Sequence, residues 1–412
     1  MPSTSETRPI AYLSGMYPAV SQTFIQREIE ALRAAGADIR ICSIRATPAS
    51  EHIGPVDRAH AAEAFNVLPA TLSPKALGAF LWALKRPGDF GKMLKLAWKT
   101  RAPGAKALAY QAIYAAEAMV LARYLDQIGA GHIHNHFVSS SATVAMLAAT
   151  LARIPFSYTL HGPADFIEPL RWKIGEKTAR AAFVACISHY ARSQAMVFSD
   201  PVHWDRLKIV HCGVEPDLYG GDRPVCEAGE PVRFLFVGRL ARVKGLLVLL
   251  EALERMGDVN LRLDIVGDGP DRALLEDRAR PLGDRVRFLG YRRQDEVAGM
   301  LNETDIFVLP SFAEGVPVVL MEALAAGRPV VATQVAGVSE LVEDSVSGFI
   351  VPPGDIEALS DRIRRLATDP ALRARMEGAG REKVAHDYDA STEARRLLAL
   401  FAGERRAGAR PD

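Results

Sequence analysis

Short hydrophobic runs alternate along this chain with longer segments whose apolar residues recur three or four positions apart. The first unit of this pattern is an apolar run from Ile10 to Leu13, a glycine loop at Gly15, and an amphipathic stretch from Gln22 to Ala35 that ends at Gly36. Short apolar runs predict buried strands, and the helical spacing with a terminal glycine predicts a helix. Repeated alternation of the two predicts an α/β fold with parallel sheets.

The same alternation continues in two series. The polar stretch from Glu215 to Glu230, rich in glycine and proline, predicts a linker between two domains. A second series runs from Val232 to Val351, and amphipathic helices follow from about Asp355 to Leu400. Further strands are expected in the first domain at Asp38 to Ser43, His132 to His136, Phe156 to Leu160, Phe183 to Ile187 and Leu207 to His211.

A first candidate site follows the predicted strand from Phe234 to Val237. There, Gly238-Arg239-Leu240 and Lys244-Gly245 occupy a strand-to-helix loop before the helical stretch Leu246 to Met256. Gly238 permits close backbone approach to a phosphate, while Arg239 and Lys244 supply two cations for a diphosphate. These fixed charges would stabilise a departing nucleoside diphosphate without strictly requiring a metal.

A second candidate site follows the predicted strand from Asp305 to Leu309. Glu314, Gly315 and Val316 lie in its loop, and Glu322 lies in a helix predicted from Val318 to Ala326. Carboxylates accept hydrogen bonds from paired hydroxyls, which suits Glu322 to a ribose and Glu314 to a sugar ring, while the amides of Gly315 and Val316 suit anionic oxygen. As alternatives, the two glutamates offset a helix dipole and the two cations are solvated surface charges.

These motifs resemble the donor site of glycosyltransferase family 4. The turn at Val266 to Pro270, which contains Gly267, fits that pattern. In the first half, the segment Pro18 to Ile25 followed by Glu28-Ile29 resembles the opening of bacterial exopolysaccharide and colanic-acid-type glycosyltransferases, and His134 to Phe137 and Thr159 to Gly162 are also familiar there. The resemblance implies a GT-B architecture, with two Rossmann-like domains facing across a deep cleft.

The resemblance also implies domain bounds and residue roles. The expected parts are residues 1–215 as an acceptor-binding domain, 216–390 as a nucleotide-sugar donor-binding domain, and 391–412 as a helix with a polar tail, the last helices returning in part to the first domain. His161 would lie beside the donor sugar and act with Glu314, Arg239 and Lys244 in catalysis. Donor contacts are expected from Gly15, Gly238, Arg239, Lys244, Gly267, Arg287, Glu314, Gly315, Val316 and Glu322, and acceptor or cleft contacts from Ser21, His136 and Asp165.

The implied activity is that of a retaining hexosyltransferase. It would move a sugar from a nucleoside diphosphate to a hydroxyl of a saccharide or lipid-linked oligosaccharide, in the synthesis of a cell-surface polysaccharide or glycolipid. No cofactor is expected. Two alternatives stay open, namely a sugar-nucleotide epimerase of the same fold and a non-catalytic nucleotide-sugar-binding subunit.

Some single residues also have alternative roles. His161 has a local alternative, which is hydrogen bonding within its loop. Asp165 has three possible roles, which are acceptor binding, orientation of His161 and helix capping. For Gly15, the alternative to donor contact is a structural role, because any tight turn after the first strand favours glycine.

Composition agrees with this interpretation. The 412 residues are too many for one ordinary core, and a net charge of +1 argues against a nucleic-acid footprint over the whole protein. Four cysteines without metal-type spacing, Cys42, Cys186, Cys212 and Cys226, suggest reduced buried thiols. Without a signal sequence or a long apolar segment, a cytoplasmic location is expected, with peripheral contact at the inner face of the membrane as one alternative.

The segment from Thr71 to Tyr110 stands apart, with eight basic residues and one acidic residue, Asp89. Phe80, Trp82, Phe90, Leu94 and Trp98 recur among the cations at roughly helical spacing. A pair of basic amphipathic helices on an anionic membrane fits this pattern, and so does a solvated helical face whose aromatics pack on the domain.

Three histidines alternate along one predicted strand, at His132, His134 and His136. Alternate residues of a strand project to the same face, so the three invite comparison with a metal site. However, a strand of a parallel sheet is buried, and no carboxylate or cysteine follows these histidines at close ligand spacing in the sequence. This favours a row of buried histidines, and no metal is expected.

Overall fold

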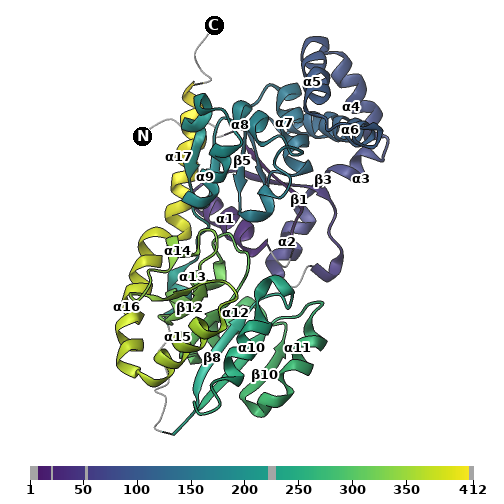
Figure 1. Cartoon of the computed structure of the whole chain (residues 1–412). Coiled ribbons are helices and arrows are strands. Elements are labelled where there is room, and N and C mark those ends of the chain that lie inside the picture. Colours follow the sequence, from purple (N-terminus) through teal and green to yellow (C-terminus); the bar gives the residue numbers. More distant parts are fainter. Residues whose placement is uncertain (1–7, 20–21, 52–53, 221–228, 408–412) are drawn as a thin grey trace. The chain divides into compact units, whose positions relative to one another are not determined.

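The computed structural model describes residues 8–19, 22–51, 54–220 and 229–407, which form two compact units (Figure 1). Unit 1 consists of the chain up to Val210 together with the C-terminal segment from Ser391, and unit 2 comprises His211–Ala390. Each unit is a parallel sheet with helices, as the alternating pattern predicts.

Unit 1 is built on a seven-stranded sheet with the order β3-β2-β1-β4-β5-β6-β7. The strand order changes direction between β1 and β4, and ligands bind near such a switch point in open α/β sheets. The strands are β1 (Ile10–Met16), β2 (Ile39–Arg45), β3 (Phe65–Asn66), β4 (His132–His136), β5 (Phe156–Leu160), β6 (Val184–Cys186) and β7 (Leu207–Ile209).

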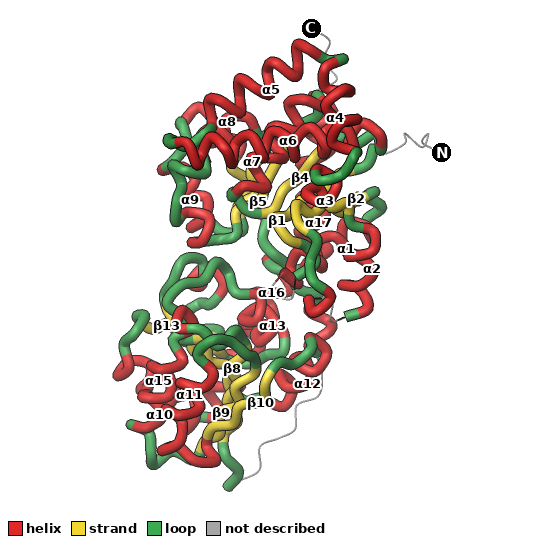
Figure 2. Tube along the Cα trace, turned by 90° about the vertical axis from the view of Figure 1, so that its right-hand side faces the viewer, coloured by secondary structure: helices red, strands yellow, loops and turns green. Residues whose placement is uncertain are grey.

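Helices cover both faces of this sheet (Figure 2). Alternation along β1 places Ala11 and Leu13 in one core cluster, with residues of α5, α6 and α7, and Ile10 and Tyr12 in the other, with residues of α1 and α17. The helices are α1 (Thr23–Ala34), α2 (Pro55–Glu63), α3 (Val67–Thr71), α4 (Lys75–Leu84), α5 (Pro87–Thr100), α6 (Ala105–Gln127), α7 (Ser140–Ala152), α8 (Ile174–Arg180), α9 (His189–Val197) and α17 (Ala390–Ala407).

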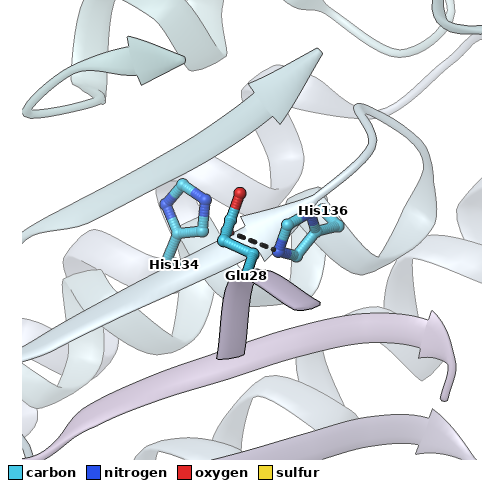
Figure 3. A group of neighbouring side chains, drawn as sticks. All are labelled: Glu28, His134 and His136. Carbon is cyan, nitrogen blue, oxygen red and sulfur yellow. Dashed lines mark ion pairs between the residues drawn. The ribbon is translucent and has the colours of Figure 1, made fainter. Parts of the chain in front are cut away.

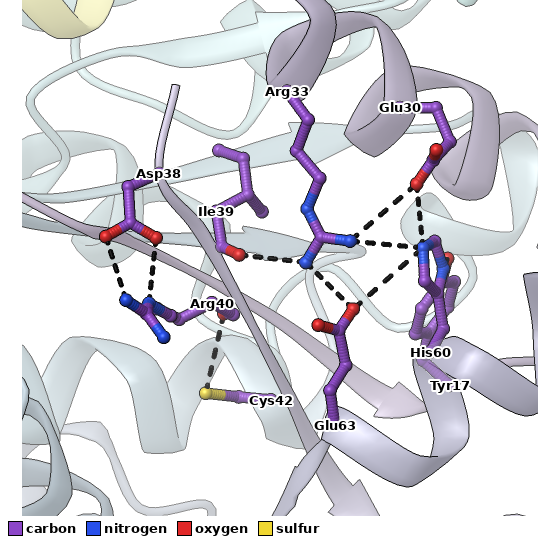
Figure 4. A network of polar contacts seen from close by, with 9 residues as sticks. All are labelled: Tyr17, Glu30, Arg33, Asp38, Ile39, Arg40, Cys42, His60 and Glu63. Carbon is purple, nitrogen blue, oxygen red and sulfur yellow. Dashed lines mark hydrogen bonds and ion pairs between the residues drawn. The ribbon is translucent and has the colours of Figure 1, made fainter. Parts of the chain in front are cut away.

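A polar network attaches α2 to α1 (Figure 4). Arg33 of α1 donates to the Glu63 carboxylate of α2 at 2.8 Å. His60 of α2 lies 2.8 Å from the Glu30 carboxylate of α1 through Nε2 and 2.8 Å from the Tyr17 hydroxyl through Nδ1. His60 is the one buried residue of α2, so hydrogen bonds and ion pairs hold this helix more than apolar packing does.

Unit 2 has a six-stranded sheet with the order β10-β9-β8-β11-β12-β13, and its switch point lies between β8 and β11. Asp355 and Asp369 cap α15 and α16 by accepting hydrogen bonds from the amides of Ala358 and Leu372. The strands are β8 (Val232–Val237), β9 (Leu261–Val266), β10 (Val286–Gly290), β11 (Ile306–Leu309), β12 (Val330–Thr333) and β13 (Gly348–Val351). The helices are α10 (Leu246–Glu254), α11 (Arg272–Ala279), α12 (Gln294–Glu303), α13 (Val318–Ala325), α14 (Val338–Leu341), α15 (Ile356–Thr368) and α16 (Pro370–Asp387).

Several sequence expectations differ from the structure in detail. β1 continues to Met16, so the expected loop at Gly15 is wrong, and a Cβ there would meet no atom within 4 Å. The segment from Thr71 to Tyr110 contains α4, α5 and the start of α6 instead of two helices. In the stretch expected to be a linker, Pro216–Tyr219 forms a 3-10 turn within unit 2, and residues 221–228 lie outside the described residues.

The described helices include none with both the length and the apolar character needed to cross a bilayer. Cys42, Cys186 and Cys212 are buried and are not in disulfides, and Cys226 lies outside the described residues.

Candidate active site

The turns after β8 and β9 pack backbone against backbone at the carboxyl end of the unit 2 sheet. The Gly238 amide donates to the Val266 carbonyl at 3.0 Å. Gly267 has φ of 131°, and a Cβ there would lie 2.0 Å from the Gly238 carbonyl oxygen, so only glycine fits. Gly238 and Gly267, both expected in the donor pocket, therefore lie together.

The loop after β8 also contacts the loop after β11. Gly245 has φ of 67°, and a Cβ there would lie 2.0 Å from the Pro310 carbonyl oxygen. The Phe312 amide donates to the Val243 carbonyl at 2.7 Å. These contacts hold the two loops that carry the predicted cations and the first predicted carboxylate side by side.

Lys244 and Glu314 form an ion pair across these loops. The Lys244 Nζ atom donates to Glu314 Oε1 at 2.6 Å, and the two side chains are 22% and 11% exposed. Arg239 lies at the same edge, and its exposed side chain makes no hydrogen bond or ion pair to the described residues. The site thus combines one paired cation with one cation that is available to an anion.

Glu322 lies on α13 and is held by a residue that the sequence analysis did not single out. The Tyr219 hydroxyl donates to Glu322 Oε1 at 3.0 Å. Glu322 is 7% exposed and Tyr219 is 1% exposed, so this hydrogen bond is shielded from water. It orients the carboxylate that is expected to bind ribose hydroxyls.

The remaining predicted donor residues of unit 2 differ in their placement. Val316 is 5% exposed, and the Gly315 carbonyl accepts a hydrogen bond from the Gly337 amide at 3.1 Å, so both belong to the packing of the Glu314 loop. Arg287 lies near the amino end of β10, where its guanidinium makes two 2.7 Å hydrogen bonds to Asp264. The structure does not bring Arg287 to the loops at the opposite end of the sheet.

In unit 1 the structure brings His136 and His161 together. His136 ends β4, His161 follows β5, and His136 Nδ1 lies 3.0 Å from His161 Nε2. The rings of Phe24 and Phe137 lie 4.7 Å and 4.6 Å from the His161 ring. Burial lowers the pKa of His161 well below its ordinary value, and His136 adds to this shift, so His161 is neutral near pH 7.

Asp165 supports the His161 loop from within. Its buried carboxylate accepts hydrogen bonds from the amides of His161 at 2.7 Å and Val138 at 2.9 Å. Lys177, which is 1% exposed, donates to the carbonyls of Val138 and Ser139. Burial raises the pKa of Asp165 and lowers the pKa of Lys177. Of the three roles considered for Asp165, these contacts favour orientation of the His161 backbone.

The histidine row of β4 is a hydrogen-bonded network. His134 lies 2.7 Å from the Ser157 hydroxyl through Nδ1 and 2.8 Å from the Thr159 hydroxyl through Nε2. Glu28, His134 and His136 hold ligand-type atoms within 4.8 Å of one another (Figure 3). A tetrahedral metal needs ligand atoms about 3.3 Å apart with free lone pairs. Since hydroxyl groups engage both nitrogens of His134, these residues fit a polar network better than a metal site.

Some functional candidates were missed or are not placed. Ser21 lies outside the described residues, and Gly15 lies in β1 with open space around it. Glu28 and Tyr219 contact the predicted site residues His136 and Glu322, and Lys177 interacts electrostatically with Asp165, yet no motif marked Tyr219 or Lys177. A buried lysine or tyrosine within a polar stretch gives no periodic signal, so only the fold reveals it.

Two family models match the chain in sequence order. The model of Glycosyltransferase Family 4 matches residues 21–218, and the model of Glycosyl transferases group 1 matches residues 223–383. Anabaena HepE, whose structure was solved in complex with UDP, aligns with a TM-score of 0.72 at 19% identity and covers 96% of this chain and 100% of HepE. At this identity, the match shows the fold.

Curated relatives agree with the family models. The chain is 35% identical over 209 residues to the amylovoran biosynthesis glycosyltransferase AmsK of Erwinia amylovora. This alignment covers 48% of this chain and 51% of AmsK. It is 30% identical over 278 residues to the glycosyltransferase TuaC of Bacillus subtilis, which is named for teichuronic acid biosynthesis. This alignment covers 64% of this chain and 68% of TuaC. The chain thus spans about half the length of AmsK and about two thirds of TuaC. Its sheets, its loops and these matches together show that the chain belongs to glycosyltransferase family 4 and has the two Rossmann-like domains of the GT-B fold.

Proposed function

We propose that this protein is a retaining glycosyltransferase. It transfers a sugar from a nucleoside diphosphate to a hydroxyl of a saccharide or lipid-linked oligosaccharide, in the synthesis of a cell-surface polysaccharide or glycolipid. The observation that carries the proposal is the pairing of Lys244 with Glu314 beside the exposed Arg239 at one sheet edge. The amylovoran name of AmsK and the UDP bound to HepE support the same substrate class.

In this proposal each charged group has a separate part of the donor. The diphosphate binds Arg239 and draws Lys244 from its present partner, since two phosphate groups outcompete one carboxylate for cations. Glu314 is then released to accept hydrogen bonds from sugar hydroxyls. Glu322, held by Tyr219, accepts hydrogen bonds from the ribose.

The chemical step breaks the bond between the anomeric carbon and the phosphate oxygen. The acceptor oxygen forms its bond to the same face of that carbon, and the acceptor proton passes to the departing phosphate oxygen. Negative charge grows on the diphosphate during this step, and Arg239 and Lys244 stabilise it. These two cations supply the charge that a metal would otherwise provide, so we propose transfer without a metal cofactor.

Two other functions are distinguished by their products. An epimerase would change the donor sugar without an acceptor, and a binding subunit would retain donor without turnover. Arg239, Lys244 and Glu314 are all present, which favours catalysis over binding alone.

The test is turnover of a panel of nucleoside diphosphate sugars by the purified protein, with and without an extract of lipid-linked saccharides. We expect release of one nucleoside diphosphate that rises with the extract, and a product with the anomeric configuration of the donor. Arg239→Ala should abolish most of this release, while Arg255→Ala, an exposed arginine paired with Glu251, serves as the control. Donor isomerisation without nucleotide release would overturn the proposal.

We further propose that α4, α5 and the start of α6 place unit 1 on an anionic membrane, where a lipid-linked acceptor resides. α4 presents Leu77, Leu81 and Leu84 to solvent on one side, while Ala79 and Ala83 are buried on the other. Trp82 and Phe90 pack on the core, as the alternative of simple packing requires, yet Trp98 is 59% exposed. The exposed apolar side chains of this region are Leu72, Leu77, Phe80, Leu81, Leu84, Leu94, Trp98, Leu108, Tyr110 and Ile113.

Exposed cations occur in the same segment and favour anionic lipid. Lys75, Lys85, Lys92, Lys95 and Lys106 are exposed, whereas the acid of this segment, Asp89, is buried against Arg153. Basic residues near an apolar surface add about 1 kcal/mol each at an anionic leaflet.

Vesicle flotation tests this contact. We expect binding to vesicles that contain phosphatidylglycerol and none to vesicles of phosphatidylcholine alone. Leu81→Asp and Trp98→Ala should reduce the bound fraction, while Leu274→Asp, at an exposed leucine of unit 2, should leave it unchanged. Equal binding by all three variants would contradict the proposal.

A further inference from the structure

One buried nitrogen in the histidine network is unsatisfied. His136 is 1% exposed, and its Nε2 atom makes no hydrogen bond to the described residues. Glu28 Oε1 of α1 lies 3.5 Å from this nitrogen, and the dashed line in Figure 3 marks this ion pair. The other ring nitrogen, Nδ1, lies 3.0 Å from His161 Nε2. A carboxyl group and two imidazoles therefore form a continuous line from α1 to the His161 loop.

We propose that Glu28 is a positioning residue that determines, through His136, which ring nitrogen of His161 carries the proton. The proposal rests on the proposed function only in that the family resemblance assigns His161 to the donor sugar. The tautomer decides whether a neutral histidine offers a donor or an acceptor to a hydroxyl group.

Proton counting along the line gives two arrangements. With Glu28 ionised, His136 directs Nε2–H toward the carboxylate and accepts at Nδ1, so His161 must donate from Nε2. With Glu28 protonated, its O–H faces His136 Nε2, so His136 donates from Nδ1 and His161 carries its proton on Nδ1. One proton on Glu28 therefore selects the tautomer of two histidines.

Both imidazoles stay neutral while Glu28 titrates. Burial lowers the pKa of His136 to about 3 and the pKa of His161 well below its usual value. Burial raises the pKa of Glu28 to about 7. The exchange between the two arrangements is therefore expected near neutral pH.

The groups that face Glu28 come from several elements. The Tyr12 hydroxyl of β1 donates to Glu28 Oε1 at 2.8 Å and lowers the pKa of Glu28, whereas Glu393 of α17 raises it. His134 and His136 of β4 also lie within 4.8 Å of the Glu28 carboxylate. Tyr12 thus provides an independent means of moving the titration of Glu28 without removing its carboxyl group.

The test is the imidazole nitrogen spectrum of the ligand-free protein labelled with nitrogen-15, recorded from pH 5.5 to pH 8.5. Protonated and bare ring nitrogens give separate signals. We expect the His161 proton on Nδ1 at the acidic end and on Nε2 at the basic end. His134, whose nitrogens are held by Ser157 and Thr159, serves as the internal control and should keep one tautomer.

Two variants make the proposal falsifiable. Glu28→Gln should remove the pH dependence of the His161 tautomer, and Tyr12→Phe should move its midpoint to higher pH. If Glu28→Gln does not fold, Tyr12→Phe still tests the proposal. A His161 tautomer that is constant with pH in the unmodified protein, or that still switches in Glu28→Gln, would overturn the proposal.

Turnover is measured separately. Because the spectrum needs no donor, a protein that shows the tautomer switch but no sugar transfer would refute the proposed function and leave the role of Glu28 intact. If transfer is observed, Glu28→Gln should change the pH profile of kcat more than the KM for the donor.

Discussion

Lys244 and Glu314 lie 70 positions apart in sequence, and their side chains meet at 2.6 Å. Close contacts between the loops after β8 and β11 produce this pair, because the Gly245 backbone packs against the Pro310 carbonyl. In the proposed cycle, the pair holds both groups in place before donor arrives and exchanges its partners when donor binds.

Loss of Lys244 should therefore affect binding and chemistry together. Lys244→Met removes a cation from the developing diphosphate charge, so we expect kcat to fall by about 10² to 10³. It also leaves Glu314 unpaired in a largely buried position, which should lower stability by about 1 kcal/mol. Single-turnover rates and thermal unfolding of the same preparation measure the two effects. A rate within twofold of the unmodified protein would contradict the assignment.

Arg239 should act mainly in the transition state. Arg239→Ala is expected to lower kcat at saturating donor by about 10²-fold, with less change in donor affinity, because phosphate charge increases as the bond breaks. Arg287→Ala is an informative comparison, since Arg287 is paired with Asp264 near the other end of its strand. We expect a near-normal rate for that variant, and equal losses for both arginines would refute this distinction.

Tyr219 should contribute to nucleotide affinity through Glu322. Tyr219→Phe removes one buried hydrogen bond to the carboxylate, worth about 1 kcal/mol, and the Kd for nucleotide should rise about fivefold. Calorimetric titration of the nucleoside diphosphate alone isolates this effect from the sugar. Unchanged affinity would show that Tyr219 only packs against α13.

Metal removal should leave transfer unchanged. Since Arg239 and Lys244 supply the positive charge in the proposed mechanism, we expect the same rate before and after treatment with EDTA. A rate that falls on chelation and returns with added Mg²⁺ or Mn²⁺ would show that the two cations are insufficient.

The stability of unit 1 should fall as the pH rises through the range in which Glu28 titrates. Burial raises the folded pKa of Glu28 to about 7 from its ordinary value of 4.5, so the folded state holds this proton more tightly. The stabilisation is complete below the unfolded pKa and is lost between about pH 4.5 and 7, by at most about 3 kcal/mol. The side chain is 15% exposed, which reduces this value.

Tryptophan fluorescence during urea unfolding measures this effect. All four tryptophans, Trp82, Trp98, Trp172 and Trp204, lie in unit 1. Glu28→Gln should flatten the decline between pH 5 and pH 7.5, leaving the contributions of other buried acids such as Glu117. An identical decline in that variant would show that Glu28 does not cause it.

The sequence predicted the bounds of strands and helices better than the contacts between side chains that are far apart in sequence. β4 and β5 begin and end at the predicted residues, because short apolar or buried polar runs bounded by turn residues are a local signal. The loop positions of Gly238, Glu314 and His161 follow in the same way from the predicted ends of β8, β11 and β5. By contrast, Tyr219 and Glu322 are 103 positions apart, and no periodicity encodes such a contact. Gly15 was misplaced because a glycine after an apolar run fits a turn as well as the end of a strand.

The most direct test is a thermal-shift screen against UDP, GDP, ADP and their sugar conjugates, using the unmodified protein, Lys244→Ala and Glu322→Ala. A ligand that binds only the folded state raises apparent stability by about 2.7 kcal/mol at a concentration 100 times its Kd. We predict a shift with one nucleotide family that both variants lose. No shift with any nucleotide, or a shift that both variants retain, would contradict the donor site proposed in unit 2.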